Sequence, residues 1–158
     1  MHIYFGAPLF CEAEKVFNLR LTDILEERGF SVFLPQRDGV ESSQSPYNEM
    51  TNDERRKAIF SLDRDKVLEA DIFLFILDGR VPDEGACVEL GMAYGQKHHL
   101  EHDKLIIGLQ TDSRSAFLGE KLNALIHGSF DCITDNENNL IVIIEEYRQV
   151  RMEGEEPS

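Results

Sequence analysis

Short apolar runs separated by longer amphipathic segments define the fold class of this chain of 158 residues. The strongest run, residues 71–77, reads Asp-Ile-Phe-Leu-Phe-Ile-Leu and predicts a central strand. Alternation of such strands with helices is typical of a parallel α/β sheet. We therefore expect a flavodoxin-like, open, mainly parallel five-stranded sheet with helices on both faces. The other strands are predicted at 3–5, 31–34, 104–108 and 129–133, and the helices at 12–28, 52–69, 85–96, 118–126 and 137–151, with an irregular loop at 36–51.

Composition narrows the class of protein. The length fits one domain over residues 1–151, followed by an acidic tail at 152–158 that we expect to be disordered. No signal-peptide pattern and no apolar run of membrane length is present. The widely spaced Cys11, Cys87 and Cys132 form neither a disulfide framework nor a zinc motif, so we expect a cytoplasmic protein. The net charge of −14 argues against a nucleic-acid polymer as ligand, but it does not exclude a small nucleoside.

Glu89 is the only formal charge between Gly85 and Gln96, in a segment that otherwise reads as a buried helix with small residues. A carboxylate in apolar surroundings is costly unless the site uses it. With Gly85 near the helix start, Glu89 lies in the second turn, where the helix dipole favours an ionised, nucleophilic carboxylate. The alternative is a buried ion pair with an arginine or lysine elsewhere in the chain.

The predicted strands end in loops that carry polar residues. In open parallel sheets, ligands bind beyond the carboxyl ends of the strands. Segments 6–10, 35–38, 78–83 and 110–112 all fall at that edge. The sequence therefore predicts one small-molecule site there.

Three further residues have both a structural and a functional interpretation. Asp83 precedes the Glu89 helix and suits an N-cap, a role that is compatible with catalysis. The residues around Asp63 are typical of a solvated helix face, which favours a structural role. Tyr4 either packs in the core or turns its ring toward the predicted ligand-binding edge.

Metal and cofactor sites are not expected. His98, His99 and His102 lie in a charged stretch that is more typical of a solvated loop than of a metal site. The sequence contains no Gly-x-Gly-x-x-Gly fingerprint, no Walker loop and no Gly-x-Ser-x-Gly elbow. Dinucleotide and triphosphate chemistry are therefore disfavoured.

Four segments in order resemble the nucleoside 2-deoxyribosyltransferase family. They are Ile-Tyr-Phe-Gly-Ala-Pro at 3–8, Asp63 leading to Ala-Asp at 70–71, Pro-Asp-Glu-Gly at 82–85, and Val-Glu-Leu-Gly-Met-Ala at 88–93. Together they cover most of the chain, from Tyr4 to about residue 128. The combination is more specific than any segment alone.

The resemblance implies exchange of the base of a 2′-deoxynucleoside through a covalent deoxyribosyl-enzyme intermediate, without metal or cofactor. It implies that Glu89 is the nucleophile and that Tyr4 hydrogen-bonds and orients its carboxylate. It also implies that Asp63 and Asp83 contact the base and transfer a proton to it. The substrates would be 2′-deoxynucleosides and free purine or pyrimidine bases.

The same resemblance assigns substrate contacts. Gly6 and Gly85, within the matched segments, are expected to line the substrate, and Gln36 or Asp38 is expected to contact the base. Asn123, lent by a neighbouring subunit, is expected to contact the sugar 5′-hydroxyl. The chain would then form a homo-oligomer with shared active sites.

Three alternatives remain open at this point. The first is an N-hydrolase that cleaves 2′-deoxynucleoside 5′-monophosphates. Such an enzyme needs Ser, Arg or Gly groups around the phosphate, and the loop at 6–10 has neither Ser nor Arg, which favours the free nucleoside. The second is a nucleoside- or nucleotide-binding module without turnover. The third is a flavodoxin-like domain whose carboxylates only cap helices.

Overall fold

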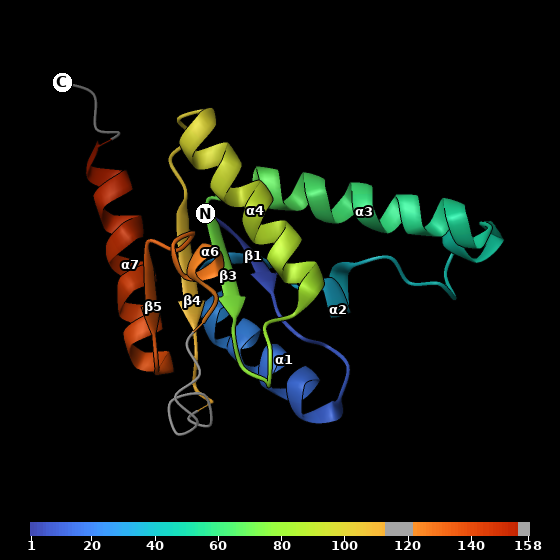
Figure 1. The fold of residues 1–158 in the computed structure, drawn as a ribbon, viewed down its shortest axis with the longest axis horizontal. Helices are drawn as coiled ribbons and strands as arrows, with labels where there is room; N and C mark the ends of the chain where they lie inside the picture. Colours follow the sequence, from blue (N-terminus) through green and yellow to red (C-terminus); the bar gives the residue numbers. More distant parts are fainter. Residues whose placement is uncertain (113–121, 155–158) are drawn as a thin grey trace.

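The computed structural model describes residues 1–112 and 122–154, and within them the strands form one parallel sheet of five strands in the order β2-β1-β3-β4-β5 (Figure 1). This order is that of flavodoxin-like sheets. The fold prediction is confirmed, with every pairing parallel. The strands are β1 (His2–Gly6), β2 (Ser31–Phe33), β3 (Ile72–Ile76), β4 (Leu105–Leu109) and β5 (Cys132–Thr134).

Helices cover both faces of the sheet, as predicted (Figure 1). On one face, Leu21 and Leu25 of α1 and Leu140 and Ile144 of α7 pack in the same cluster as alternate side chains of the strands. On the other face, α3 and α4 lie side by side and bury Val67 and their own small residues against the remaining strand side chains. The helices are α1 (Glu12–Glu27), α2 (Pro35–Asp38), α3 (Asn52–Glu69), α4 (Glu84–His99), α6 (Ala124–His127) and α7 (Glu137–Gly154), with a 3₁₀ turn, η1 (Tyr47–Glu49).

Local sequence explains where the two helices of the second face begin. Thr51 caps α3 and forms a reciprocal capping box with Glu54. The side chain of Asp83 accepts a hydrogen bond from the Ala86 amide at 2.8 Å and caps α4. The N-cap interpretation of Asp83 is therefore confirmed.

The segment after β2 differs from the prediction of an irregular loop from residue 36. Pro35 to Asp38 form α2, because proline suits the first helical position and the Asp38 carboxylate accepts from the Leu34 amide at 2.9 Å. Arg37 of this turn donates to the carbonyl of Val32 on the edge strand β2 and to both carboxylate oxygens of Glu26.

Other element bounds also shift. Helix α7 continues to Gly154, so residues 152–154 are helical rather than part of a disordered tail, and residues 155–158 lie outside the described residues. The first four residues of the helix predicted at 118–126 also lie outside them, and its second part is observed as α6 at 124–127. Strand β5 starts at Cys132 instead of 129 because Ser129 and Phe130 close a turn on α6.

No helix in the described part of the chain combines the length and the apolar character that a membrane crossing requires.

Candidate active site

The site lies where the strand order reverses, beside the carboxyl ends of β1 and β3. Tyr4 of β1 pairs in register with Phe33 of β2 and with Phe73 of β3, so the three side chains share the face covered by α3 and α4. This position is the usual ligand site of open parallel sheets.

The central contact joins this strand face to α4. The Tyr4 hydroxyl donates a hydrogen bond to Glu89 Oε1 at 2.7 Å. Tyr4 is completely buried, and Glu89 is partly buried in the second turn of α4. Burial, helped by the nearby Glu89 carboxylate, raises the pKa of Tyr4, so the phenol keeps its proton and acts as a donor.

Two more carboxylates act on the same pair, Asp63 from α3 and Asp83 from the start of α4. Burial raises the pKa of Glu89 to about 7; the Tyr4 hydrogen bond opposes this shift, and the charges of Asp63 and Asp83 add to it. Burial alone raises the pKa of Asp63 to about 6. The site therefore contains two partly desolvated carboxyl groups, Glu89 and Asp63, whose pKa values are raised toward neutral pH.

Two glycines leave room beside these groups. A Cβ at Gly6 would lie 3.3 Å from Glu89 Oε2 and 3.2 Å from the ring of Phe73. A Cβ at Gly85 would lie 3.2 Å from Asp83 Oδ2. Glu89 Oε2, the oxygen that does not receive the Tyr4 hydrogen bond, thus lies next to a position without a side chain.

The family model described as nucleoside 2-deoxyribosyltransferase matches residues 3–146. The chain belongs to this family. Two solved structures are similar to it over most of their length. A conserved protein from Enterococcus faecalis V583 is 26% identical with a TM-score of 0.72, and the match covers 94% of this chain and 97% of that one. A 2-deoxyribosyltransferase from the psychrotolerant bacterium Bacillus psychrosaccharolyticus is 25% identical with a TM-score of 0.69, covering 89% and 90%.

A third structure, a CMP N-glycosidase from Clostridium botulinum, shares the fold at 20% identity and a TM-score of 0.52, covering 92% of this chain and 99% of that one. No curated protein matches this chain.

Among the described residues of this family member, Glu89 forms no buried ion pair, which was the alternative that its sequence left open. Within residues 1–112 and 122–154, the hydrogen-bond partner of its carboxylate is Tyr4, and the charges that act on it are the carboxylates Asp63 and Asp83. No cation of the described chain offsets them.

The prediction that Asp63 lies on a solvated helix face is wrong. Its side chain is partly buried beside Tyr4 and Glu89, where a solvated helix face was expected. The spacing contained the missing signal: Asp63 precedes Val67 by four residues, and Val67 is the buried residue of α3. Residues four apart share a helix face, so Asp63 faces the sheet.

The predicted base-contacting residues make hydrogen bonds within the chain. Gln36 accepts from the Asn18 side chain and donates to the Lys15 carbonyl, both at 3.0 Å, which fastens α2 to α1. Asp38 caps its own turn and contacts Arg37. The structure does not bring either side chain into contact with Glu89, and their role toward a base stays a prediction.

Asn123 lies at the start of α6. Its side chain is exposed and accepts from the Leu125 amide at 2.9 Å. The neighbouring Leu122 and Ile126 pack against the cluster under α3 and α4. Its contact with a sugar in a neighbouring subunit stays a prediction.

Sequence reasoning missed Phe33 and Phe73, whose rings flank Tyr4. Their signal lay in strand register, which the individual strand patterns do not contain. The histidine stretch lies partly on α4, where the His98 ring contacts the Tyr94 ring in a tilted arrangement with centroids 4.2 Å apart. In residues 1–112 and 122–154, no group of three or more His, Cys, Asp or Glu side chains is arranged to hold a metal.

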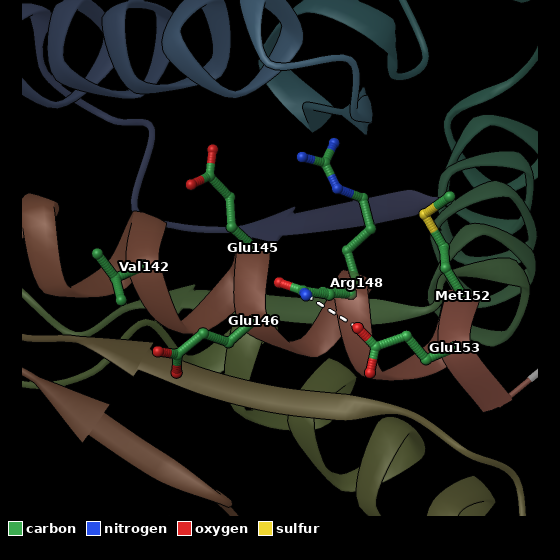
Figure 2. Close-up of a pocket in the computed structure, with 7 residues that line it drawn as sticks. Val142, Glu145, Glu146, Arg148, Met152 and Glu153 are labelled. Carbon is green, nitrogen blue, oxygen red and sulfur yellow. Dashed lines mark hydrogen bonds between the residues drawn. The ribbon is translucent and has the colours of Figure 1, made fainter.

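A groove of about 630 Å³ runs along α7, far in sequence from these carboxylates (Figure 2). Several of its polar groups make contacts within the chain: Arg148 donates to the Arg28 carbonyl at 2.8 Å, and Gln149 donates to Glu153 at 2.9 Å. We assign no catalytic role to this groove. Its lining residues all come from α7 and are Val142, Glu145, Glu146, Arg148, Gln149, Met152 and Glu153.

Proposed function

We propose that this chain is a nucleoside 2-deoxyribosyltransferase that exchanges the base of 2′-deoxynucleosides with retention of configuration. The observation that carries the proposal is the Tyr4–Glu89 hydrogen bond beside Asp63, in a site whose nearby charges are carboxylates. A carboxylate of this kind suits an oxocarbenium-like transition state, which it stabilises and then captures.

In the first half-reaction, Glu89 Oε2 attacks C1′ of the sugar while the C1′–N bond breaks. The electron pair of that bond goes to the base nitrogen, which takes a proton from Asp63. A carboxyl group with a pKa of about 6 is still protonated in a fraction of the molecules near neutral pH, so Asp63 can act as a general acid. The product is a deoxyribosyl ester of Glu89 and a free base.

In the second half-reaction, a different base attacks C1′ from the face that the first base left. The ester bond breaks, its electron pair returns to Glu89, and the proton of the attacking nitrogen returns to Asp63. Two inversions at C1′ give net retention. Tyr4 donates to Glu89 throughout and lowers its pKa, which favours the ionised nucleophile.

The preferred substrate is the free nucleoside rather than its 5′-monophosphate. The groups that act on Glu89 through charge are Asp63 and Asp83, and segment 6–10 lacks both Ser and Arg. A phosphate dianion near these carboxylates would be repelled. Deoxyadenosine should therefore react faster than dAMP, and the reverse order in a direct rate comparison would favour a monophosphate hydrolase.

Active sites shared between subunits are the second part of the proposal, with Asn123 reaching the sugar of a neighbouring subunit. Its exposed position at the start of α6 supports this role. Asn123→Ala and Glu89→Gln should each be inactive alone but regain exchange when subunits are mixed, because a hybrid assembly contains one intact site. A fully active monomer in sedimentation would remove Asn123 from the site.

The decisive experiment incubates the purified protein with 2′-deoxyinosine and adenine and separates the products by chromatography. Formation of 2′-deoxyadenosine with an equal amount of hypoxanthine is expected, together with a deoxyribosyl adduct on Glu89 by peptide mass spectrometry. Hypoxanthine with free deoxyribose alone would indicate a hydrolase. Binding without any base release would indicate a module without turnover.

A further inference from the structure

The Tyr4 ring lies between two other aromatic rings on the sheet face. Phe33 stacks on one side with centroids 5.6 Å apart and an interplanar angle of 24°. Phe73 stacks on the other side at 5.7 Å and 8°. Because these residues pair in register across β2, β1 and β3, strand pairing itself sets the spacing of the rings.

This arrangement restricts where the Tyr4 hydroxyl can go. The hydroxyl is at the tip of the ring, so a swing of the ring toward β2 or β3 that moved it from Glu89 would push the ring into Phe33 or Phe73. Tyr4 and Phe73 are fully buried, and Phe73 also packs edge-on against Phe75 with centroids 6.3 Å apart. Close-packed side chains of this kind hold their rotamers.

We propose that Phe33 and Phe73 are positioning residues for catalysis, holding the Tyr4 ring between them so that its hydroxyl stays hydrogen-bonded to the Glu89 carboxylate. The proposal rests on Glu89 acting as the nucleophile. The two phenylalanines touch neither sugar nor base in this role; they act through Tyr4.

The charges around Glu89 make this positioning consequential. Tyr4 faces it from β1, Asp63 from α3 and Asp83 from the start of α4. The two carboxylates and burial favour the protonated form of Glu89, and the Tyr4 hydrogen bond favours the ionised form. Loosening the ring therefore removes the interaction that keeps the nucleophile charged, and the pKa of Glu89 should rise further.

The test measures Glu89 directly, by carbon NMR titration of ¹³C-labelled glutamate carboxyl groups, with Glu89→Gln to assign the signal. Phe73→Leu and Phe33→Leu should raise the pKa of Glu89 in the direction that Tyr4→Phe does, but by less. Phe75→Leu is the matched control for Phe73→Leu, since both remove a fully buried ring of β3 and Phe75 is not stacked on Tyr4. An equal rise in the Phe75→Leu control, or no rise in the other two, would overturn the proposal.

A double variant separates positioning from general loosening of the core. In a Tyr4→Phe background, Phe73→Leu should leave the pKa of Glu89 where Tyr4→Phe alone puts it, because the hydroxyl through which Phe73 acts is gone. A further rise of the same size as in the wild-type background would mean that Phe73 acts by another route.

Kinetics provide the second readout. At acid pH, each rise of one in the pKa of Glu89 lowers the ionised fraction of the nucleophile tenfold. A rise of about half that size in Phe73→Leu should therefore lower the exchange rate about threefold at pH 5.5 and change it little at pH 8. If Phe73→Leu fails to fold, Phe33→Leu at the partly exposed edge position carries the test. The NMR titration needs no turnover, so a failed base-exchange assay and a failed positioning role give different results.

Discussion

Acidic residues lie at both ends of the central strands, but their pKa values are shifted in opposite directions. At the amino end, Asp71 accepts from the His2 amide at 2.8 Å and pairs with Arg151 at 2.7 Å. Burial would raise the pKa of Asp71, but these two partners outweigh it and hold the pKa below its ordinary value. At the carboxyl end, Asp63 and Glu89 have raised pKa values.

The difference lies in the cations. The amino end also contains the fully buried Lys104, whose ammonium donates to the Val67 carbonyl at 2.5 Å. The carboxyl end offers Glu89 a phenol and two like charges. A carboxylate whose pKa is lowered by its partners, such as Asp71, stabilises the fold, whereas unpaired ones keep the reactivity that a nucleophile and an acid need. The four predictions below test this division between the two ends.

The largest effect is expected for Glu89→Gln, which should reduce base exchange by about 10⁴-fold or more because the nucleophile is lost. Since the folded-state pKa of Glu89 is raised, its ionisation destabilises the fold as pH rises through about 4.5 to 7. The variant should therefore be more stable than wild type at pH 8, by about 1–3 kcal/mol in urea unfolding, with a smaller gain at pH 5. Normal exchange by this variant would end the proposed mechanism.

Asp63→Asn should lower exchange by about 10²- to 10⁴-fold, the usual contribution of a general acid. In the wild type, the rate should fall toward acid pH because Glu89, with a pKa of about 7, gains a proton. It should also fall toward alkaline pH because Asp63, with a pKa of about 6, loses its proton, so the optimum lies between pH 6 and pH 7. The variant should lose the decline on the alkaline side and keep the acid one. A pH–rate profile that keeps its alkaline decline would assign that proton to another group.

Gly6→Ala tests the space beside Glu89 Oε2. The added methyl would lie 3.3 Å from that oxygen and 3.2 Å from the Phe73 ring, so the nucleophile must shift slightly, and exchange should fall about tenfold. Gly95→Ala on α4 is the control, because a Cβ there meets nothing within 4 Å. Equal rates for both variants in the chromatographic assay would show that the space is not used.

The smallest effect is expected at the opposite end. Arg151→Met should leave exchange within about twofold and lower the free energy of unfolding by about 1 kcal/mol. Because the pKa of Asp71 is lowered in the folded state, this stabilisation is present above about pH 4 and disappears as pH falls further. Arg56→Met, whose weak pair with Asp53 spans 3.8 Å at an exposed site, should not change stability in the same urea titrations. A large loss of exchange in Arg151→Met would contradict the division.

The fold was predictable because its signals are local. Segment 71–77 shows its strand character in its own residues, and the start of α3 follows from Thr51 with Glu54. The α2 turn was missed because the segment from residue 36 was interpreted as an irregular loop, although the preceding Pro35 suits the first position of a helix.

The candidate site also has residues that the sequence reveals and residues whose surroundings it does not reveal. The isolation of Glu89 among apolar residues and the position of Asp83 before a helix are visible in sequence, so both residues stand out. The environments of Asp63 and of the Tyr4 ring depend on which strands become neighbours. Tyr4 meets Phe33 and Phe73 only after β2, β1 and β3 pair in one register, and no single segment contains that information.

The contact of Arg37 with the edge strand has a consequence for how copies of this protein meet. Strand β2 is three residues long, and the guanidinium occupies the Val32 carbonyl while it is held by Glu26. An incoming strand would have to displace a charged group that is already paired, so the β2 edge resists pairing with a strand of a second molecule and the aggregation that such growth brings.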